Sequence, residues 1–164
     1  MFAKSAAEDA INMLSQLEIL LGLKDRHRLF VGIGNVLHRD DGAGVYIVKN
    51  ILEKQHNSTL IVETCLENYI GKINALRPDE LVFVDSVFFN RQPGYWNCVP
   101  VDNIIDFTTN THNISLKALS DFFSARTWVL GLQPLSVSFG EGLSEYIEHS
   151  ANEIVEIINS YQYN

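Results

Sequence analysis

The sequence predicts a single-domain α/β protein, a three-layer sandwich whose mostly parallel, twisted sheet of about five strands has helices on both faces. Short apolar runs alternate with amphipathic helical segments along the chain, which is the order of a β-α-β fold. The run at residues 81–84 is apolar throughout, as expected for a parallel strand that helices cover on both sides. A length of 164 residues is enough for one domain with a sizeable core.

A helix is predicted before the first strand, and it is an addition to this plan. Ser5 and Glu8 have the spacing of a capping box, and Gly22 offers a stop. Between them, apolar residues recur at helical spacing, at Ala10, Leu14, Leu17 and Leu21. This stripe packs either on the domain's own sheet, which is the simpler interpretation, or on a partner. We therefore divide the chain into an N-terminal helical extension, residues 1–26, and a main domain, residues 27–164.

The remaining elements follow from apolar periodicity and from residues that start or stop helices. The predicted strands are residues 29–31, 59–63, 80–85, 95–101 and 128–132, of which 95–101 follows a Pro93-Gly94 turn and suits a sheet edge. The predicted helices are one with apolar positions Val45, Val48, Ile51 and Leu52, and those at residues 69–76, 116–123 and 144–161. Ser115 and Ser144 are expected to cap the last two helices.

Composition excludes several classes of function. The chain has 12 basic and 20 acidic residues, a net charge of -8, which disfavours nucleic acid as a partner. Acidic residues interrupt the first segment, and no apolar run approaches membrane-spanning length, so we expect neither a secretory signal nor membrane insertion. The two cysteines, Cys65 and Cys98, lack C-x-x-C spacing and predict reduced thiols in a cytoplasmic protein. Cys65 follows a strand end, where we expect a buried, inert thiol.

The segment at residues 31–44 is the most informative part of the chain. It places Gly32, Gly34, Asn35 and the pair Asp40-Asp41 directly after an apolar strand. Glycines suit a sharp exit from a strand, where the backbone turns or approaches another group closely. Either aspartate can cap the helix that follows, which leaves at least one carboxylate at the edge of the sheet.

Three polar residues mark a candidate site at that edge. Asp41 follows the first strand, Asp85 closes the third, and His112 lies in a polar segment before the helix at Ser115. Ligands of open α/β sheets bind at the carboxyl ends of the strands, so the three side chains can face one cleft. Two carboxylates and an imidazole suit a divalent first-row metal and leave positions open for water or substrate. Taken singly, each has a structural interpretation as a helix cap, a strand end or a loop histidine.

Other residues near this edge carry weaker signals. His38 and Glu63 could add a ligand or a hydrogen bond, although solvated side chains are the simpler interpretation. Gly32-Ile33-Gly34 with Glu63 imitates a dinucleotide-binding fingerprint, but Leu37 replaces its third glycine and the acidic pair would repel pyrophosphate. No G-x-S-x-G elbow for a serine hydrolase occurs.

Four segments in order resemble the hydrogenase maturation endopeptidases, which trim the carboxyl terminus of the large subunit of nickel-iron hydrogenases. The segments are residues 32–44, Val84-Asp85 with Pro93-Gly94, Thr111 to Leu116, and Gly131-Leu132-Gln133-Pro134, the last resembling the formate-hydrogenlyase type. The resemblance covers about residues 28–161. The chain departs from the family in its N-terminal helix, in His38-Arg39, and in Thr64-Cys65, where relatives often carry paired glycines.

The resemblance implies an activity and a partner. Asp41, Asp85 and His112 match the family's three metal-contacting positions, and Asp41 or Asp85 would be the general base. The expected function is removal of the C-terminal extension of a nickel-iron hydrogenase large-subunit precursor after nickel insertion, by a monomer in the cytoplasm. The nickel would arrive bound to the substrate, although another divalent metal could use the same site. The alternative is a non-cleaving chaperone that binds the nickel-loaded subunit.

Overall fold

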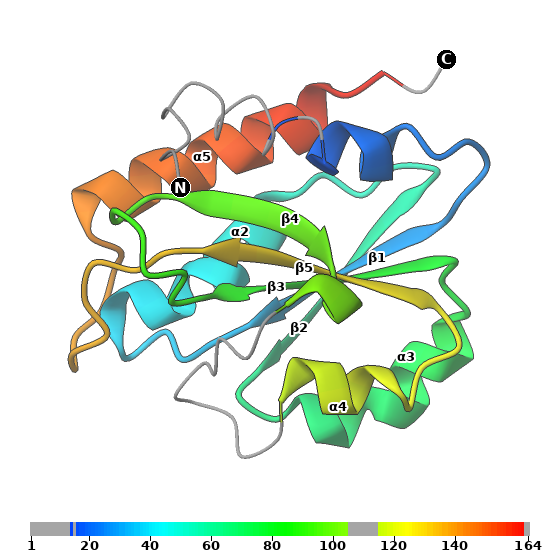
Figure 1. Cartoon of the computed structure of the whole chain (residues 1–164), viewed down its shortest axis with the longest axis horizontal. Coiled ribbons are helices and arrows are strands. Elements are labelled where there is room, and N and C mark those ends of the chain that lie inside the picture. Colours follow the sequence, from blue (N-terminus) through cyan, green and yellow to red (C-terminus); the bar gives the residue numbers. More distant parts are fainter. Residues whose placement is uncertain (1–13, 15, 105–114, 163–164) are drawn as a thin grey trace, which may run out of the picture.

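A central sheet with helices on both faces forms the frame of the protein (Figure 1). The computed structural model describes residues 14, 16–104 and 115–162. The strands are β1 (Arg28–Ile33), β2 (Asn57–Glu63), β3 (Glu80–Ser86), β4 (Trp96–Pro100) and β5 (Arg126–Leu132). The helices are α2 (Ala43–Asn50), α3 (Ile70–Leu76), α4 (Leu116–Ser120) and α5 (Glu145–Ser160), with 3-10 turns η1 (Arg39–Gly42), η2 (Leu66–Tyr69) and η3 (Val101–Asn103).

The strand order is β2-β1-β3-β5-β4, and this order confirms the predicted fold class. β1, β2, β3 and β5 pair in parallel, whereas β4 pairs antiparallel with β5 at one edge of the sheet. The expectation that the strand after Pro93-Gly94 lies at an edge is therefore confirmed. β1 and β3 are neighbours in the middle of the sheet, so their carboxyl ends come together.

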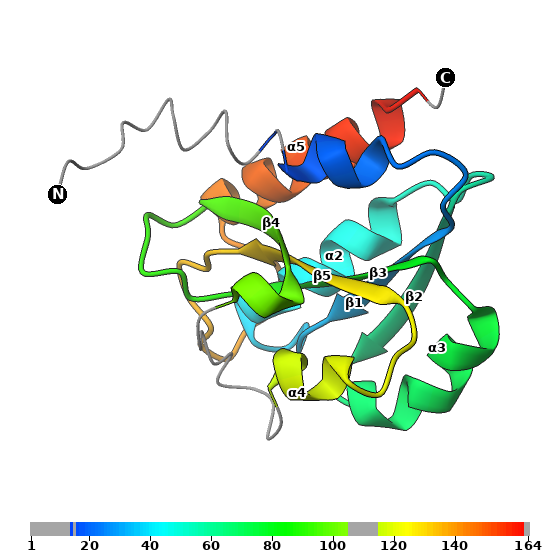
Figure 2. The same cartoon turned by 45° about the vertical axis from the view of Figure 1, so that its right-hand side comes forward.

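Each face of the sheet has its own apolar core, because side chains alternate between the faces of a strand. On one face, Phe30, Val82 and Trp128 pack under α2 and α5. On the other face, Leu29, Phe83 and Val129 pack under α3 and α4. Figure 2 shows these two layers of helices on either side of the strands. The predicted three-layer sandwich is thus observed.

The described part of the N-terminal segment is helical at residues 16–21, and it lies beside α5 (Figure 1). Leu17, Leu20 and Leu21 are fully buried in the core under α2 and α5. Arg28 at the start of β1 is also fully buried, and its guanidinium donates to the carbonyls of Leu20 (2.9 Å) and Leu21 (2.6 Å). The helix is therefore attached to the sheet by apolar packing and by hydrogen bonds to its last carbonyl groups.

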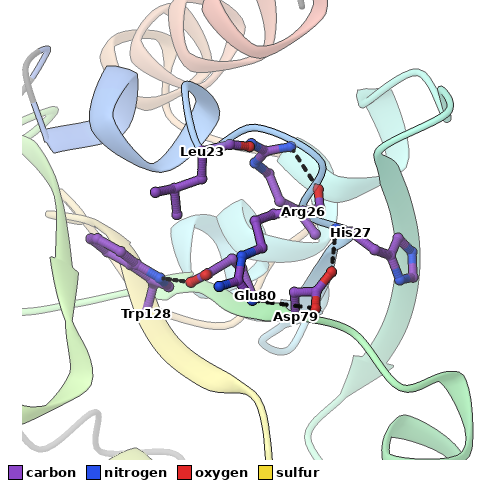
Figure 3. Close-up of polar contacts among 7 residues, drawn as sticks. Leu23, Arg26, His27, Asp79, Glu80 and Trp128 are labelled. Atoms are coloured by element: carbon purple, nitrogen blue, oxygen red, sulfur yellow. Dashed lines mark hydrogen bonds and ion pairs between the residues drawn. The ribbon is translucent and has the colours of Figure 1, made fainter.

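The amino ends of β1 and β3 are joined by polar contacts (Figure 3). The Asp79 carboxylate accepts a hydrogen bond of 2.8 Å from the backbone N–H of His27, and the His27 carbonyl accepts one from the N–H of Glu80. The buried Glu80 carboxylate accepts a 2.7 Å hydrogen bond from the indole N–H of Trp128. These contacts lie at the amino ends of the strands, whereas the candidate site lies at their carboxyl ends.

Two predictions about helix starts are partly wrong. Gly42 is the N-cap of α2, and neither Asp40 nor Asp41 caps it, because both aspartates lie within the 3-10 turn η1 that precedes the helix. Ser144 is the N-cap residue of α5, but its side chain donates to Asp40 instead of capping the helix. Ser115 does cap α4, accepting from the N–H of Ala118, and α4 ends at Ser120, short of the predicted residue 123.

Candidate functional site

The candidate site begins where β1 leaves the sheet and the chain turns back into α2. Gly34 has a φ of 128°, and a Cβ built there would lie 1.8 Å from the Asp41 carbonyl oxygen. A Cβ on Gly44 would lie 2.0 Å from the carbonyl oxygen of Val84 and 2.4 Å from that of Ile33. Only glycine permits these approaches, because any other residue brings a Cβ. The two glycines therefore bring η1 and α2 directly onto the ends of β1 and β3.

Asp41 is held at this position by two hydrogen bonds from different strand ends. Its side chain is 2% exposed. One carboxylate oxygen accepts from the backbone N–H of Asn35 at 2.8 Å, and the other accepts from the Ser86 hydroxyl at 3.2 Å. Asn35 follows β1 and Ser86 ends β3, so the carboxylate joins the two central strands at their carboxyl ends.

Asp85 is the residue before Ser86, and it is 1% exposed. One of its carboxylate oxygens accepts from the backbone N–H of Ser86 at 2.8 Å. Its register partner on β5 is Gly131. The ends of β1 and β3 thus bring both predicted aspartates to one edge of the sheet, where Asp41 bonds to the residue next to Asp85.

The third predicted ligand, His112, lies outside the residues that the structure describes. Within the described ranges, no three His, Cys, Asp or Glu side chains are grouped as a metal site would require. Among those residues, Asp41 and Asp85 are two buried carboxylates that both contact Ser86 at the carboxyl end of β3. A site with three protein ligands here needs a further side chain, as the sequence predicts with His112.

The side chains of the weaker candidates, His38, Glu63 and Cys65, contact a loop or are exposed. Nδ1 of His38 lies 3.2 Å from the carbonyl oxygen of Val137, in the loop between β5 and α5. Glu63 ends the outer strand β2 with an exposed side chain. Cys65 is exposed, so the expectation of a buried thiol there is wrong: the residue follows an edge strand, outside both cores. The buried cysteine is Cys98 on β4, and burial raises the pKa of its thiol to about 12.

Sequence reasoning missed the role of Asp40. Its side chain is fully buried, and its carboxylate accepts hydrogen bonds from the backbone N–H groups of Leu135 (3.0 Å), Ser136 (2.9 Å) and Ser144 (2.6 Å). The Ser144 hydroxyl donates a fourth, at 2.9 Å. Asp40 therefore fixes the loop between β5 and α5 against η1. These partners are about a hundred residues away in the sequence, so local spacing gives no sign of them.

Ser86 and Gln133 were also missed. Ser86 supports Asp41, and its position directly after Asp85 at the end of a buried strand was the one available signal. Gln133 is buried, and its side-chain oxygen accepts from the N–H of Phe89 at 2.7 Å. It thereby ties the segment after β3 to the end of β5, next to the aspartates.

The fold and these residues define the class of protein: an open α/β sheet that carries a buried carboxylate site at the carboxyl ends of its central strands. The family model of the hydrogenase maturation protease, HycI, matches residues 45–161. This match covers most of the chain. The chain belongs to the hydrogenase maturation protease family.

Individual relatives agree with this assignment. The hydrogenase 3 maturation protease of Escherichia coli K12 is 26% identical over 138 residues, which are 80% of this chain and 88% of that protein. The crystal structure of a [NiFe] hydrogenase maturation protease HycI from Thermococcus kodakarensis matches with a TM-score of 0.71 at 26% identity, covering 85% of this chain and 98% of that one. The solution structure of the endopeptidase HycI from Escherichia coli matches with a TM-score of 0.73 at 26% identity, covering 84% and 92%.

Among the residues that the structure describes, no helix has both the length and the apolar character needed to cross a bilayer.

Proposed function

We propose that this protein is the endopeptidase that removes the C-terminal extension of a nickel-iron hydrogenase large-subunit precursor after nickel insertion. The observation that carries the proposal is the buried pair of carboxylates, Asp41 and Asp85, at the ends of the central strands of a hydrogenase maturation protease. Membership of this family supports protease activity, and Asp41 and Asp85 supply the carboxylates that the proposed reaction uses.

Nickel enters this proposal as part of the substrate. Asp41 and Asp85 supply carboxylate oxygens and His112 an imidazole nitrogen, a donor set that suits a borderline divalent ion. A carboxylate has about four lone-pair positions, and Asp41 uses two in its bonds to Asn35 and Ser86. The remaining positions can bind a metal that the precursor presents. A precursor without nickel would offer these three side chains no shared ion, which would make the protease selective for the loaded form.

The proposed chemistry is hydrolysis of one peptide bond. The oxygen of a water molecule adds to the scissile carbonyl carbon, and a carboxylate takes the proton of that water. The carbon–nitrogen bond then breaks, and the proton passes to the leaving amine. Asp41 and Asp85 are the two candidates for the base. The hydrogen bonds of Asp41 hold it in one orientation, which suits a group that must meet a reacting atom.

The proposal places the reaction in the cytoplasm and the enzyme as a monomer that meets its precursor transiently. The two described cysteines are free, one exposed and one buried, which suits a reducing compartment.

The test is the intact mass of the precursor from the same organism after incubation with the protein. We expect a C-terminal peptide to be lost from the nickel-loaded precursor and not from the unloaded one. Asp41→Asn and Asp85→Asn should each slow cleavage by about a hundredfold or more, because each removes a carboxylate from the site. His112→Ala should also prevent cleavage of the nickel-loaded precursor, because it removes a proposed ligand of the nickel ion.

The controls separate cleavage from binding. Circular dichroism of each variant checks that the fold is intact, and a binding assay measures the affinity for the loaded precursor. If wild-type protein binds the loaded precursor and leaves its mass unchanged, the protein is a chaperone and the proposed activity is wrong. Full activity in Asp41→Asn or Asp85→Asn would remove that residue from the mechanism.

A further inference from the structure

Exposed apolar side chains gather on two loops beside the candidate site. We call these residues the apolar rim. They are Val36 and Leu37, after β1, and Leu135 and Phe139, after β5, with exposed fractions of 43%, 46%, 56% and 80%. Both loops leave the carboxyl ends of their strands, so both lie at the edge of the sheet that holds Asp41 and Asp85.

Backbone hydrogen bonds join the two loops into one surface. The N–H of Gly140 donates to the Leu37 carbonyl, and the N–H of Arg39 donates to the Gly140 carbonyl, both at 2.8 Å. The rings of His38 and Phe139 meet edge to face, with centroids 6.1 Å apart. Phe139, the most exposed residue of the apolar rim, therefore lies next to His38, which follows Leu37 in the chain.

The apolar rim is also continuous with the site. A Cβ on Gly42 would lie 3.0 Å from the Cα of Val36, so the chain beside Asp41 touches the first residue of the rim. Asp40 lies beneath the same surface, where its carboxylate binds the N–H groups of Leu135 and Ser136. A buried charge with several hydrogen bonds holds both loops in place, so the surface is ordered before anything binds.

Large apolar side chains at 43% to 80% exposure on fixed loops need a reason, because burying them would stabilise the protein. We propose that the apolar rim docks an apolar segment of the polypeptide substrate, next to the bond that is cut. This inference rests on the proposed function. The rim lies next to the turn that carries Asp41, so a polypeptide whose scissile carbonyl reaches Asp41 and Asp85 would lie beside it. Ordered loops would bind that polypeptide without the cost of ordering them first.

The experiment compares two exposed phenylalanines, one at the carboxyl ends of the strands and one at the amino ends. Phe139→Ser removes the largest side chain of the apolar rim. Phe122→Ser removes one that is 61% exposed in the turn between α4 and β5, at the amino edge, and it serves as the matched control. A second pair is Leu37→Ser against Leu52→Ser, the latter 60% exposed just after α2. KM and kcat are measured by intact mass on the nickel-loaded precursor, and affinity is measured in a separate binding assay.

We expect Phe139→Ser and Leu37→Ser to raise KM and weaken binding by about tenfold or more, since truncating a central apolar contact commonly costs that much. The value of kcat should stay unchanged, and both control variants should match the wild type. Unchanged KM and affinity in Phe139→Ser and Leu37→Ser would overturn the inference while leaving the proposed function intact.

The binding assay separates the two proposals. If wild-type protein binds the precursor without cleaving it and Phe139→Ser weakens that binding, the docking surface stands and the proposed activity fails. If wild-type protein binds no precursor, the docking inference is overturned. Sedimentation of the protein alone provides a further check: a wild-type dimer that Phe139→Ser converts to a monomer would show that a second copy of the chain covers the rim, and would also overturn the inference.

Discussion

Asp40 and Asp41 are neighbours in sequence, and both are buried, yet their carboxylates contact different parts of the molecule. Asp41 bonds to the ends of β1 and β3, whereas Asp40 bonds to the loop before α5. The 3-10 turn Arg39–Gly42 produces this separation, because consecutive side chains in such a turn project about a third of a turn apart. At the scale of single residues, one aspartate is a candidate site residue and the other is structural.

Asp40→Ala tests the structural role. The substitution leaves the N–H groups of Leu135, Ser136 and Ser144 without their acceptor, and hydrogen bonds to a charged group are worth about 1.5–3 kcal/mol each. We expect the free energy of unfolding, measured in urea, to fall by about 3 kcal/mol or more. Glu141→Ala is the control, since Glu141 is an exposed acid in the same loop. Equal stability of the two variants would contradict the assignment.

The two cysteines give a second prediction at this scale. Cys98 is buried, and its pKa is raised to about 12, so it stays a neutral thiol at ordinary pH. Cys65 is exposed. An alkylating reagent at about pH 8 should modify Cys65 and leave Cys98 unmodified in the native protein, whereas both should react in urea. Peptide mapping by mass spectrometry identifies the modified residue, and rapid native labelling of Cys98 would contradict the described packing of β4.

At the scale of elements, the contacts between the amino ends of β1 and β3 make stability depend on pH. The backbone N–H of His27 donates to Asp79 and lowers the pKa of its carboxyl group, and the charge of Arg26, 3.4 Å away, acts in the same direction. The ionised form is thus favoured in the folded state. Its contribution to stability is present above the unfolded-state pKa of about 3.9 and is lost as the pH falls through the lower folded-state value.

Asp79→Asn removes this dependence. The variant should be less stable than the wild type near neutral pH, and the difference should narrow as the pH falls below about 4, where the wild type also loses the charge. Urea denaturation at a series of pH values measures it. Asp121→Asn, at an exposed aspartate after α4, provides the control. A difference between wild type and Asp79→Asn that stays constant from neutral to acidic pH would show that the hydrogen bond contributes nothing through ionisation.

The sequence predicts most elements because their signals are local. The apolar run at residues 81–84 identifies the central strand β3, and Ser115 identifies the start of α4. Errors arise where distant contacts replace local ones. Ser144 has the spacing of a cap, but its hydroxyl bonds to Asp40. Cys65 follows an apolar strand, yet that strand is at the edge of the sheet, a position that periodicity does not reveal.

The same reasoning applies to the candidate site. The position of Asp41 and Asp85 at one end of the sheet could be predicted, because parallel strands bring their carboxyl ends together whatever the details of packing. Ser86 and Gln133 could not, because their roles depend on which strand end faces which loop. The expectation for His112 stays a prediction, since that residue lies outside the described ranges.

At the scale of the whole molecule, the described part of the N-terminal helix belongs to the core. Leu17, Leu20 and Leu21 are fully buried, and each such side chain contributes about 2 kcal/mol. Their loss on deletion of residues 1–26 amounts to about 6 kcal/mol, comparable to the whole stability of many domains. We therefore expect the truncated chain to unfold at a much lower urea concentration, or to fail to fold.

A pair of substitutions keeps this prediction testable if the truncated chain cannot be purified. Leu20→Ala should lower the free energy of unfolding by about 2–5 kcal/mol, because it leaves a cavity under α5. Ile19→Ala, at a residue 52% exposed on the same helix, should change it by less than about 1 kcal/mol. Similar losses for the two variants would contradict the described orientation of the helix.

The adjacency of Asp40 and Asp41 has a consequence for genetics. Substitutions at either position should give the same loss of hydrogenase maturation in a living cell, so a growth screen alone would count both as catalytic. The two would differ in the amount of protein that accumulates. Variants at position 40 lose four hydrogen bonds and variants at position 41 lose two, so proteolysis should deplete the former more strongly. A screen that records abundance together with phenotype is therefore needed to separate folding defects from defects of the reaction.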